Sequence, residues 1–345
     1  MRICYVGHKF HKRTKSCEFF LQILQSIGSV DEFFYSPDEP SESDREIITE
    51  LSTSKYDCYI FYQAERIAEK LAPLGLGRFV IVPMYDGAIG LPASFWRSFV
   101  DAQFISFSRA HHEELQRIGC KTAYFQYFPE PQSSLGYTFT GDLSGFFWER
   151  RPGQEPSFQT VVKLARHLGL QHLHVHAAPD FGITGSGRLN WPDRFEFAGL
   201  EVTLSRWFED RAEFNRLVER SHFFFAPRAL EGIGMSFVEA MSRGQIVVAP
   251  DLPTMNEYLR HETTGLLYDI GKTYSSSRLS PKVLETISQA AQRKVERGHE
   301  DWMSDQDRLK SIIMNDGRRW PTKDVSSNFR SVLMRRAHER AMRAS

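Results

Sequence analysis

The chain alternates short apolar runs with longer amphipathic segments, and it begins this alternation twice. Apolar runs of about four to eight residues followed by helical patterns indicate parallel strands in a sheet that is covered on both faces. We therefore expect one Rossmann-like α/β domain in residues 1–133. Its predicted strands are Arg2–Val6, Asp57–Tyr62, Arg78–Pro83, Gln103–Ser106 and Thr122–Phe128, and its predicted helices include Cys17–Ile27 and Arg109–Ile118.

The second start follows the clearest break in the pattern, which is Pro129-Glu130-Pro131 and the loop after it. We place a second Rossmann-like domain in residues 134–316 and a helical tail in residues 317–345. Open α/β sheets bind ligands beyond the carboxyl ends of their strands, so we expect the active site in a cleft where the two domains face each other. Predicted elements of the second domain are Gly145–Trp148, Phe158–Leu168, His172–Ala178, Arg211–Arg220, Phe223–Ala226, Met235–Arg243, Gln245–Ala249, Met255–His261 and Gly265–Tyr268.

Charge and cysteine content exclude several classes of protein. The 43 Lys and Arg residues balance 43 Asp and Glu residues, so the strongly basic surface of a general nucleic-acid binder is absent and no nucleic-acid partner is expected. We find neither a signal peptide nor an apolar run of about 18 residues that would span a membrane. The cysteine spacing matches no CxxC pair, which predicts free thiols and a cytoplasmic location. The cysteines are Cys4, Cys17, Cys58 and Cys120.

The stretch from Phe223 to Asp269 carries the most chemistry. A buried strand leads through Pro227 into a glycine-containing loop, and the helix that begins near Met235 has free N–H groups and a positive dipole end. Such an end binds anions, most often phosphate. The glycines of this loop remove side chains where a ligand approaches the backbone. Glu231 and Glu239 border the same pocket, and carboxylates beside a phosphate site usually bind hydroxyl groups. The predicted ligand is a nucleotide sugar.

A family resemblance rests on the order of residues in this stretch. Glu231-Gly232-Ile233-Gly234-Met235, Glu239-Ala240-Met241, Gly244, Val247-Val248 and Thr264-Gly265-Leu266-Leu267 follow one another. This order resembles the Glu-x7-Glu region of retaining glycosyltransferases of family 4, which have the GT-B fold. The spacing alone is weak evidence, because Glu201 and Glu209 form another such pair.

The resemblance implies roles for particular residues. Glu239 would bind the ribose hydroxyls, and Glu231 would bind a sugar hydroxyl. A basic pair after the first strand of this domain would hold the leaving diphosphate without a metal, with Arg150 as the main residue and either Arg151 or a residue from elsewhere as the second cation. The backbone N–H groups that would contact sugar and diphosphate belong to Gly232, Ile233, Gly234, Met235 and Ser236.

The amino-terminal domain departs from the resemblance. The family often has a Gly-Gly pair after its first strand, whereas this chain has a basic loop from Gly7 to Ser16 that includes Lys15. This loop either faces the donor phosphate or an acidic acceptor, or is simply solvated. Asp86 follows the strand Arg78–Pro83, where it either serves as a base or hydroxyl-binding residue or forms a turn before Gly87.

Two further features have a plain structural interpretation. His172, His174 and His176 project to one side of a predicted strand, and we expect them to pack under helices rather than to bind a metal. Residues 317–345 hold eight basic and two acidic residues. We expect this tail to cross back onto the first domain, and contact with the surface of an anionic membrane is compatible with that position.

Together these features predict a retaining GT-B glycosyltransferase with two Rossmann-like domains. It would move a hexose or deoxyhexose from a nucleotide sugar to a saccharide or lipid-linked saccharide acceptor, with no cofactor and no metal. The resemblance favours capsule or O-antigen polysaccharide synthesis on the cytoplasmic side of a bacterial membrane. The alternatives are a GT-B nucleotide-sugar epimerase and a non-catalytic subunit that binds nucleotide sugars.

Overall fold

The computed structural model describes residues 1–36, 42–99, 101–180, 191–272 and 278–315. By the contacts between their residues, they divide into two compact units. The first unit contains Met1–Tyr127 and the end of the last helix from Glu300, and the second contains Phe128–His299. The first unit thus ends a few residues before the predicted boundary at residue 133. The predicted helical tail, residues 317–345, lies outside the described residues.

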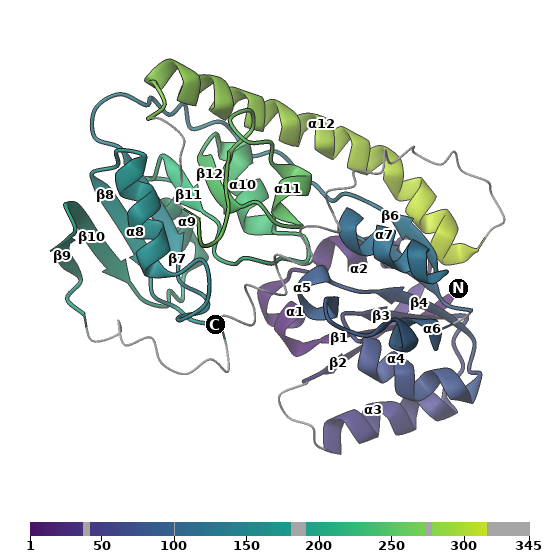
Figure 1. Cartoon of the computed structure of the whole chain (residues 1–345). Helices are drawn as coiled ribbons and strands as arrows, with labels where there is room; N and C mark the ends of the chain where they lie inside the picture. The colour runs from purple at the N-terminus through teal and green to yellow at the C-terminus, as the bar shows by residue number, and fades with distance from the viewer. Residues whose placement is uncertain (37–41, 100, 181–190, 273–277, 316–345) are drawn as a thin grey trace. The chain divides into compact units, whose positions relative to one another are not determined.

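The first unit is built on a six-stranded sheet with the order β2-β1-β3-β4-β5-β6, in which all neighbouring strands are parallel (Figure 1). The strands β3 and β4 are apolar runs that are almost completely buried, as the sequence pattern predicts. The strand β2 was not predicted from the sequence. It is an edge strand with two acidic residues, and Tyr35 is its one buried residue. The strands are β1 (Arg2–His8), β2 (Ser29–Tyr35), β3 (Cys58–Tyr62), β4 (Arg78–Val82), β5 (Gln103–Ser106) and β6 (Lys121–Tyr124).

The helices of the first unit connect these parallel strands. They pack apolar side chains such as Leu51, Ile67 and Leu115 against the sheet, in a core that also holds Phe61 and Phe104. The helices are α1 (Lys9–Thr14), α2 (Glu18–Gln25), α3 (Glu42–Thr53), α4 (Glu65–Leu71), α5 (Tyr85–Ala88), α6 (Ala93–Arg97) and α7 (Arg109–Ile118), with a short 3₁₀ helix at Ala72–Leu74.

The second unit is built on a seven-stranded sheet with the order β13-β12-β11-β7-β8-β10-β9. Its strands are parallel except β9, which pairs antiparallel with β10 at one edge. The β9–β10 pair was not predicted from the sequence. The strands are β7 (Ser144–Trp148), β8 (His172–His176), β9 (Arg194–Phe197), β10 (Leu200–Ser205), β11 (Phe223–Phe225), β12 (Ile246–Pro250) and β13 (Leu266–Tyr268).

The helices of the second unit follow the predicted pattern. Helix α8 packs Val161 and Leu164 on the sheet, where they join Phe147, Phe223 and Val248 in the core of this unit. The helices are α8 (Phe158–His167), α9 (Arg211–Val218), α10 (Met235–Arg243), α11 (Met255–Tyr258) and α12 (Pro281–Met314).

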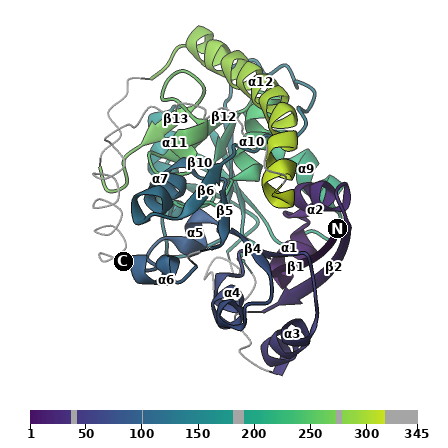
Figure 2. The ribbon, with the colours of Figure 1, turned by 90° about the vertical axis from the view of Figure 1, so that its right-hand side faces the viewer.

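Helix α12 has 34 residues and is continuous in both views of the ribbon (Figure 2). Its first part belongs to the second unit, where the Ser288 hydroxyl donates a 2.6 Å hydrogen bond to the carbonyl of Gly244. Its last part belongs to the first unit, where the Trp302 ring packs against the rings of Phe19 and Tyr127. The helical pattern that the sequence shows after Pro281 is therefore confirmed up to Met314.

The state of the cysteines and the apolar content of the helices can be compared with what the sequence predicts. All four cysteines are free thiols; Cys4, Cys17 and Cys58 are buried and Cys120 is half-buried. Burial raises the pKa of the Cys58 thiol to about 11, so the thiol stays protonated at neutral pH. Among the described residues, no helix combines the length and the apolar composition needed to cross a membrane.

Candidate functional site

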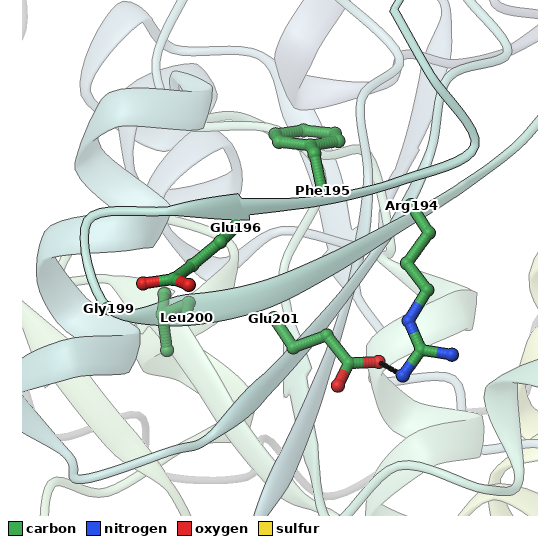
Figure 3. A pocket seen from close by; sticks show the side chains of 6 residues that line it. All are labelled: Arg194, Phe195, Glu196, Gly199, Leu200 and Glu201. Atoms are coloured by element: carbon green, nitrogen blue, oxygen red, sulfur yellow. Dashed lines mark ion pairs between the residues drawn. The ribbon is translucent and has the colours of Figure 1, made fainter.

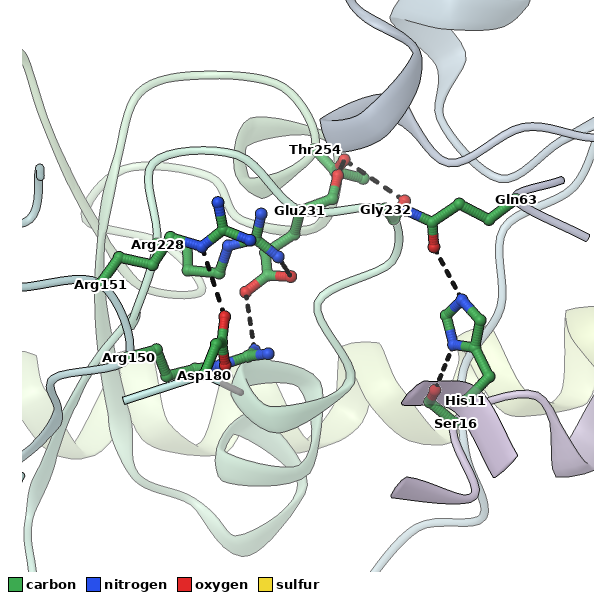
Figure 4. Close-up of polar contacts among 10 residues, drawn as sticks. All are labelled: His11, Ser16, Gln63, Arg150, Arg151, Asp180, Arg228, Glu231, Gly232 and Thr254. Carbon is green, nitrogen blue, oxygen red and sulfur yellow. Dashed lines mark hydrogen bonds and ion pairs between the residues drawn. The ribbon is translucent and has the colours of Figure 1, made fainter. Parts of the chain in front are cut away.

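The polar residues of the second unit gather at the carboxyl edge of its sheet. Arg150 follows β7, Asp180 follows β8, Glu231 follows β11 and Thr254 follows β12 (Figure 4). Parallel strands end at the same edge, so these four loops lie together although they are far apart in the sequence. The sequence pattern predicts this placement for Arg150 and Glu231.

The carboxylate of Glu231 lies between two guanidinium groups. Its Oε1 atom is 3.7 Å from Nη1 of Arg150, and its Oε2 atom is 3.7 Å from Nη1 of Arg228. The three side chains are 9%, 13% and 14% exposed, so little solvent screens these charges. The backbone is fixed as well, because the Thr254 hydroxyl donates a hydrogen bond to the carbonyl of Glu231. At the start of the glycine loop, Glu231 thus has a hydrogen-bonded backbone carbonyl and a carboxylate between two cations.

The carboxylate of Asp180 holds the basic pair after β7. Its Oδ1 atom accepts a 2.7 Å hydrogen bond from Nε of Arg150, and its Oδ2 atom accepts a 3.3 Å bond from Nε of Arg151. The backbone N–H of Asp180 also donates to the carbonyl of Arg150 at 2.9 Å. The Arg150 guanidinium lies 5.1 Å from the centre of the Trp148 ring, which further limits its motion. Asp180 thus positions Arg150 more tightly than Arg151.

Helix α10 begins at a glycine whose backbone is left-handed. Gly234 has φ 81°, and a Cβ atom at this position would lie 1.9 Å from the ring of Phe237. The first turn of α10 contains no acidic residue that would offset the positive end of its dipole. From the sequence, this glycine is predicted to allow the close approach of a ligand. The structure gives another physical reason, because the backbone angle and the Phe237 ring already require glycine.

The remaining predicted donor-binding residues lie on the same loop and helix. Gly232 and Ile233 are buried, whereas Met235 and Ser236 are half-buried in the first turn of α10. Glu239 lies one turn further along α10 and is half-buried. Burial lowers the pKa of Arg243 on the same helix, and the negative charge of Glu239 partly opposes this shift. The assigned roles of these residues in binding a donor stay predictions.

Gly7 and Lys15 belong to the first unit. Gly7 is buried near the end of β1, where a Cβ atom would lie 2.8 Å from the Tyr5 ring, so packing alone explains the glycine. Lys15 is exposed and ends α1 with a left-handed backbone at φ 57°. The side chain of His8 caps the start of α1 by accepting a 2.9 Å hydrogen bond from the N–H of Phe10. The basic loop predicted from the sequence is therefore largely a short helix.

Asp86 lies at the carboxyl edge of the first sheet, in the short helix α5 after β4, and is half-buried. Its charge acts on the His11 ring, which is buried and hydrogen-bonded to Ser16 and to Gln63, each at 2.7 Å. Burial lowers the pKa of His11 to about 4, so the ring is neutral near pH 7. Gln63 is fixed in turn by the Tyr35 hydroxyl, which donates to its carbonyl at 2.6 Å. Asp86 therefore lies beside an ordered polar cluster.

Glu65, which starts α4 near this cluster, is expected to make stability depend on pH. Its Oε1 atom has no hydrogen-bond partner among the described residues, and burial raises the pKa of the carboxyl from 4.5 to about 7. Between these values the folded chain binds more protons than the unfolded chain, so the free energy of unfolding falls as pH rises from about 4.5 to about 7. The full effect is on the order of 3 kcal/mol.

Denaturant titrations of wild type and Glu65→Gln at several pH values would check this expectation. The stability difference between the two proteins should shift in favour of the Gln variant as pH rises, because only the wild type loses a bound proton. A difference that stays constant across this pH window would contradict the buried neutral carboxyl.

Arg228, Asp180, Gln63 and Thr254 were not identified from the sequence. Arg228 lies within the stretch that was analysed, but its contact with Glu231 was not predicted. Asp180 follows the predicted strand His172–Ala178. A polar residue at the end of a parallel strand could have marked it as a site residue. Gln63 also follows a buried strand, but its contact with His11 joins residues 52 positions apart, which spacing alone does not reveal.

The histidines on β8 are engaged within the second unit. The ring of His174 is hydrogen-bonded to the hydroxyls of Thr203 and Ser205, at 2.7 and 2.8 Å, and His176 shares the Ser205 hydroxyl at 2.9 Å. Burial lowers the pKa of both rings to about 4. In the parts of the chain that the structure describes, no three His, Cys, Asp or Glu side chains come together as metal ligands.

A surface pocket of about 380 Å³ lies on the β9–β10 edge of the second sheet (Figure 3). An ion pair of 2.5 Å between Arg194 and Glu201 crosses it. None of the predicted site residues lines this pocket, and two strands, β8 and β10, separate β9 from β7. The lining residues are Arg194, Phe195, Glu196, Gly199, Leu200 and Glu201.

Part of the second unit matches a known family. Residues 198–298 match the family described as glycosyl transferases group 1, and this range includes Arg228, Glu231 and Glu239. No curated protein sequence matches the chain.

Several solved structures share the fold of the whole chain at low sequence identity. Anabaena HepE in complex with UDP is 14% identical, with a TM-score of 0.60 and coverage of 90% of this chain and 100% of that chain. Sucrose-phosphate synthase from Thermosynechococcus elongatus is 12% identical, with a TM-score of 0.65 and coverage of 92% and 99%. The apo form of the lipopolysaccharide outer core galactosyltransferase WaaB is 13% identical, with a TM-score of 0.56 and coverage of 100% and 99%. The predicted fold class is confirmed: the chain has two Rossmann-like α/β domains of the GT-B type, and residues 198–298 are similar to group 1 glycosyl transferases.

Proposed function

We propose that this protein is a retaining glycosyltransferase that moves a hexose or deoxyhexose from a nucleotide sugar to an acceptor hydroxyl. The observation that supports this proposal most is Glu231, a carboxylate held between Arg150 and Arg228 directly before the positive end of α10. A carboxylate of this kind binds sugar hydroxyls, while guanidinium groups and a helix start bind phosphate. HepE, which shares the fold, has been solved with UDP and with UDP-glucose.

In the proposed reaction, the second unit binds the donor. Glu239 binds the ribose hydroxyls, and the N–H groups at the start of α10 contact the diphosphate. Arg150 offsets the charge that develops on the leaving diphosphate, and Asp180 keeps its guanidinium in position. Glu231 binds a hydroxyl of the transferred sugar and fixes the orientation of its ring.

Retention of configuration requires either two displacements or attack from the face of the leaving group. We favour attack from the leaving-group face, in which the departing diphosphate accepts the proton of the acceptor hydroxyl. The carboxylate of Glu231 lies 3.7 Å from a guanidinium group on each side, and these positive charges draw electron density away from its oxygens, which weakens it as a nucleophile. The bond from the anomeric carbon to the phosphate oxygen breaks as the bond to the acceptor oxygen forms.

The acceptor we propose is a growing envelope polysaccharide or its lipid-linked precursor. The support comes from the fold shared with WaaB, a lipopolysaccharide outer core galactosyltransferase, and from the eight basic residues in residues 317–345. Basic residues near an anionic lipid surface contribute about 1 kcal/mol each to peripheral binding. Asp86 at the carboxyl edge of the first sheet is the proposed contact for an acceptor hydroxyl.

Nucleotide binding tests the donor part of the proposal. Calorimetric titration with UDP, GDP, dTDP and ADP should identify a ligand for the wild type. Glu239→Ala should remain folded and bind that ligand about 10- to 100-fold more weakly, because each hydrogen bond to a carboxylate contributes roughly 1.5–3 kcal/mol. Equal affinity in wild type and variant would contradict the ribose-binding role.

Catalysis is expected to need no divalent metal, since arginine side chains supply the positive charge at the diphosphate. Transfer in the presence of excess EDTA should proceed at the rate measured without it. Loss of turnover in EDTA that manganese or magnesium restores would overturn this expectation.

An epimerase of nucleotide sugars is the second candidate for the same donor site. It would convert the donor without any acceptor and without net release of nucleotide. A non-catalytic binding subunit would do neither. Product analysis after incubation with donor alone identifies the epimerase, and a second incubation with an acceptor separates the transferase from the binding subunit.

A further inference from the structure

The second cation of the diphosphate site has two candidates in the second unit. Arg151 is the neighbour of Arg150 after β7, and Arg228 lies in the loop between β11 and α10. They differ in exposure and in the carboxylate that holds them. This difference identifies which of them accompanies Arg150.

Arg151 is the more weakly held of the two candidates. Its side chain is 37% exposed, and its Nε atom is 3.3 Å from Asp180, whose other oxygen already binds Arg150 at 2.7 Å. Solvent screens a charge in this position. Arg151 therefore offers little electrostatic stabilisation to a bound phosphate.

Arg228 is buried more deeply and shares a carboxylate with Arg150. Its guanidinium is 3.7 Å from one oxygen of Glu231, and the Arg150 guanidinium is 3.7 Å from the other (Figure 4). Two guanidinium groups of low exposure on either side of one carboxylate repel each other, and Asp180 pairs with Arg150 as well, at 2.7 Å. A phosphate group bound between Arg150 and Arg228 would be attracted to both guanidinium groups.

The place of Arg228 in the chain also favours a phosphate ligand. Arg228 and Glu231 belong to the loop between β11 and α10. The Arg228 side chain therefore comes from the segment that leads directly into the first turn of α10. Guanidinium groups bind phosphate oxygens through two parallel hydrogen bonds, which a planar fork of N–H donors provides.

We propose that Arg228 and Arg150 together bind the diphosphate of the donor, and that Glu231 holds both guanidinium groups in place before the donor arrives. This inference rests on the proposed function. Arg228 would be the second cation at the diphosphate. From the sequence, that cation was either Arg151 or a residue from elsewhere.

Calorimetric titration with two related ligands tests the assignment. The ligands are the tightest binder among UDP, GDP, dTDP and ADP, and the monophosphate of the same nucleoside. Arg228→Ala should bind the diphosphate about 10- to 100-fold more weakly and the monophosphate less than about threefold more weakly. The reason is that the lost hydrogen bonds are to the terminal phosphate of the diphosphate, which the monophosphate lacks. Arg228→Lys should recover part of the loss, since it keeps the charge without the fork.

Two control variants separate the site from general effects of charge. Arg151→Ala should produce a smaller loss for the diphosphate than Arg228→Ala. Arg220, exposed at the end of α9 before β11, lies at the opposite edge of the same sheet, and Arg220→Ala should bind both ligands like the wild type. Equal losses for diphosphate and monophosphate in Arg228→Ala, or no loss for either, would overturn the assignment.

A double-mutant cycle tests whether Arg228 acts only by holding Glu231. If it binds phosphate directly, Arg228→Ala should still weaken diphosphate binding in a Glu231→Gln background. No further loss in that background would show a positioning role alone and would overturn the proposal. Wild type that binds none of the four diphosphates would instead remove the proposed function itself, so the two failures are distinguishable.

Discussion

Glu231→Gln is expected to lower kcat for sugar transfer by about 100-fold or more, because it removes a charged hydrogen bond that orients the transferred sugar. Affinity for the nucleoside diphosphate should change much less than kcat, because two effects oppose each other. The variant loses the charge that holds Arg150 and Arg228 in place, both 3.7 Å away, but it also removes a carboxylate that competes with phosphate for them. The two measurements are kcat under saturating donor and calorimetric affinity for the diphosphate.

Glu201→Gln is a matched control for this variant. Glu201 also begins a Glu-x7-Glu spacing, with Glu209, but it lies on β10 in an ion pair with Arg194. We expect its kcat and diphosphate affinity to equal those of the wild type. A Glu231→Gln enzyme with wild-type kcat, or a Glu201→Gln enzyme with the same loss, would contradict the role of Glu231.

Arg150→Ala is expected to lower kcat by about 10²- to 10³-fold, the effect of removing one preorganised group that stabilises developing negative charge. Arg150→Lys should recover only part of this loss, because lysine keeps the charge but not the two parallel donors. The removal also leaves Asp180, which accepts a 2.7 Å bond from Arg150, with its weaker contact to Arg151. Single-turnover kinetics would report the chemical step directly.

The Arg150→Ala, Asp180→Asn double variant separates catalysis from folding. Asparagine removes the charge that the single variant leaves poorly paired, so the double variant should regain thermal stability. Its kcat should stay as low as that of Arg150→Ala. Recovery of both stability and kcat would show that Arg150 matters for folding and not for the reaction.

The elements that sequence patterns predict here are the buried ones. β3, β4 and β11 are continuous apolar runs, and apolar periodicity predicts α10 from Met235 to Arg243 as the structure has it. The edge strands β2 and β9 escaped prediction because their burial is incomplete. β2 carries two acidic residues, and β9 has four residues of which only one is even half-buried.

The candidate site shows a similar division. Arg150 could be predicted from the family resemblance, and Glu231 from its place just before the helix that begins near Met235. The contacts of Arg228 and Asp180 could not, since they depend on which side chains of separate loops meet. Gly234 was predicted as a place where a ligand approaches the backbone, which stays a prediction, and the structure adds that its backbone angle and the Phe237 ring require glycine.

Product analysis with a panel of nucleotide sugars tests the central claim most directly. Each donor is incubated with and without an acceptor saccharide, and released nucleotide and acceptor mass are measured together. We expect one donor to release nucleotide in step with the gain of one sugar on the acceptor, in wild type but not in Glu231→Gln. Conversion of the donor to an epimer without acceptor, or tight donor binding with no turnover of any acceptor, would contradict a glycosyltransferase.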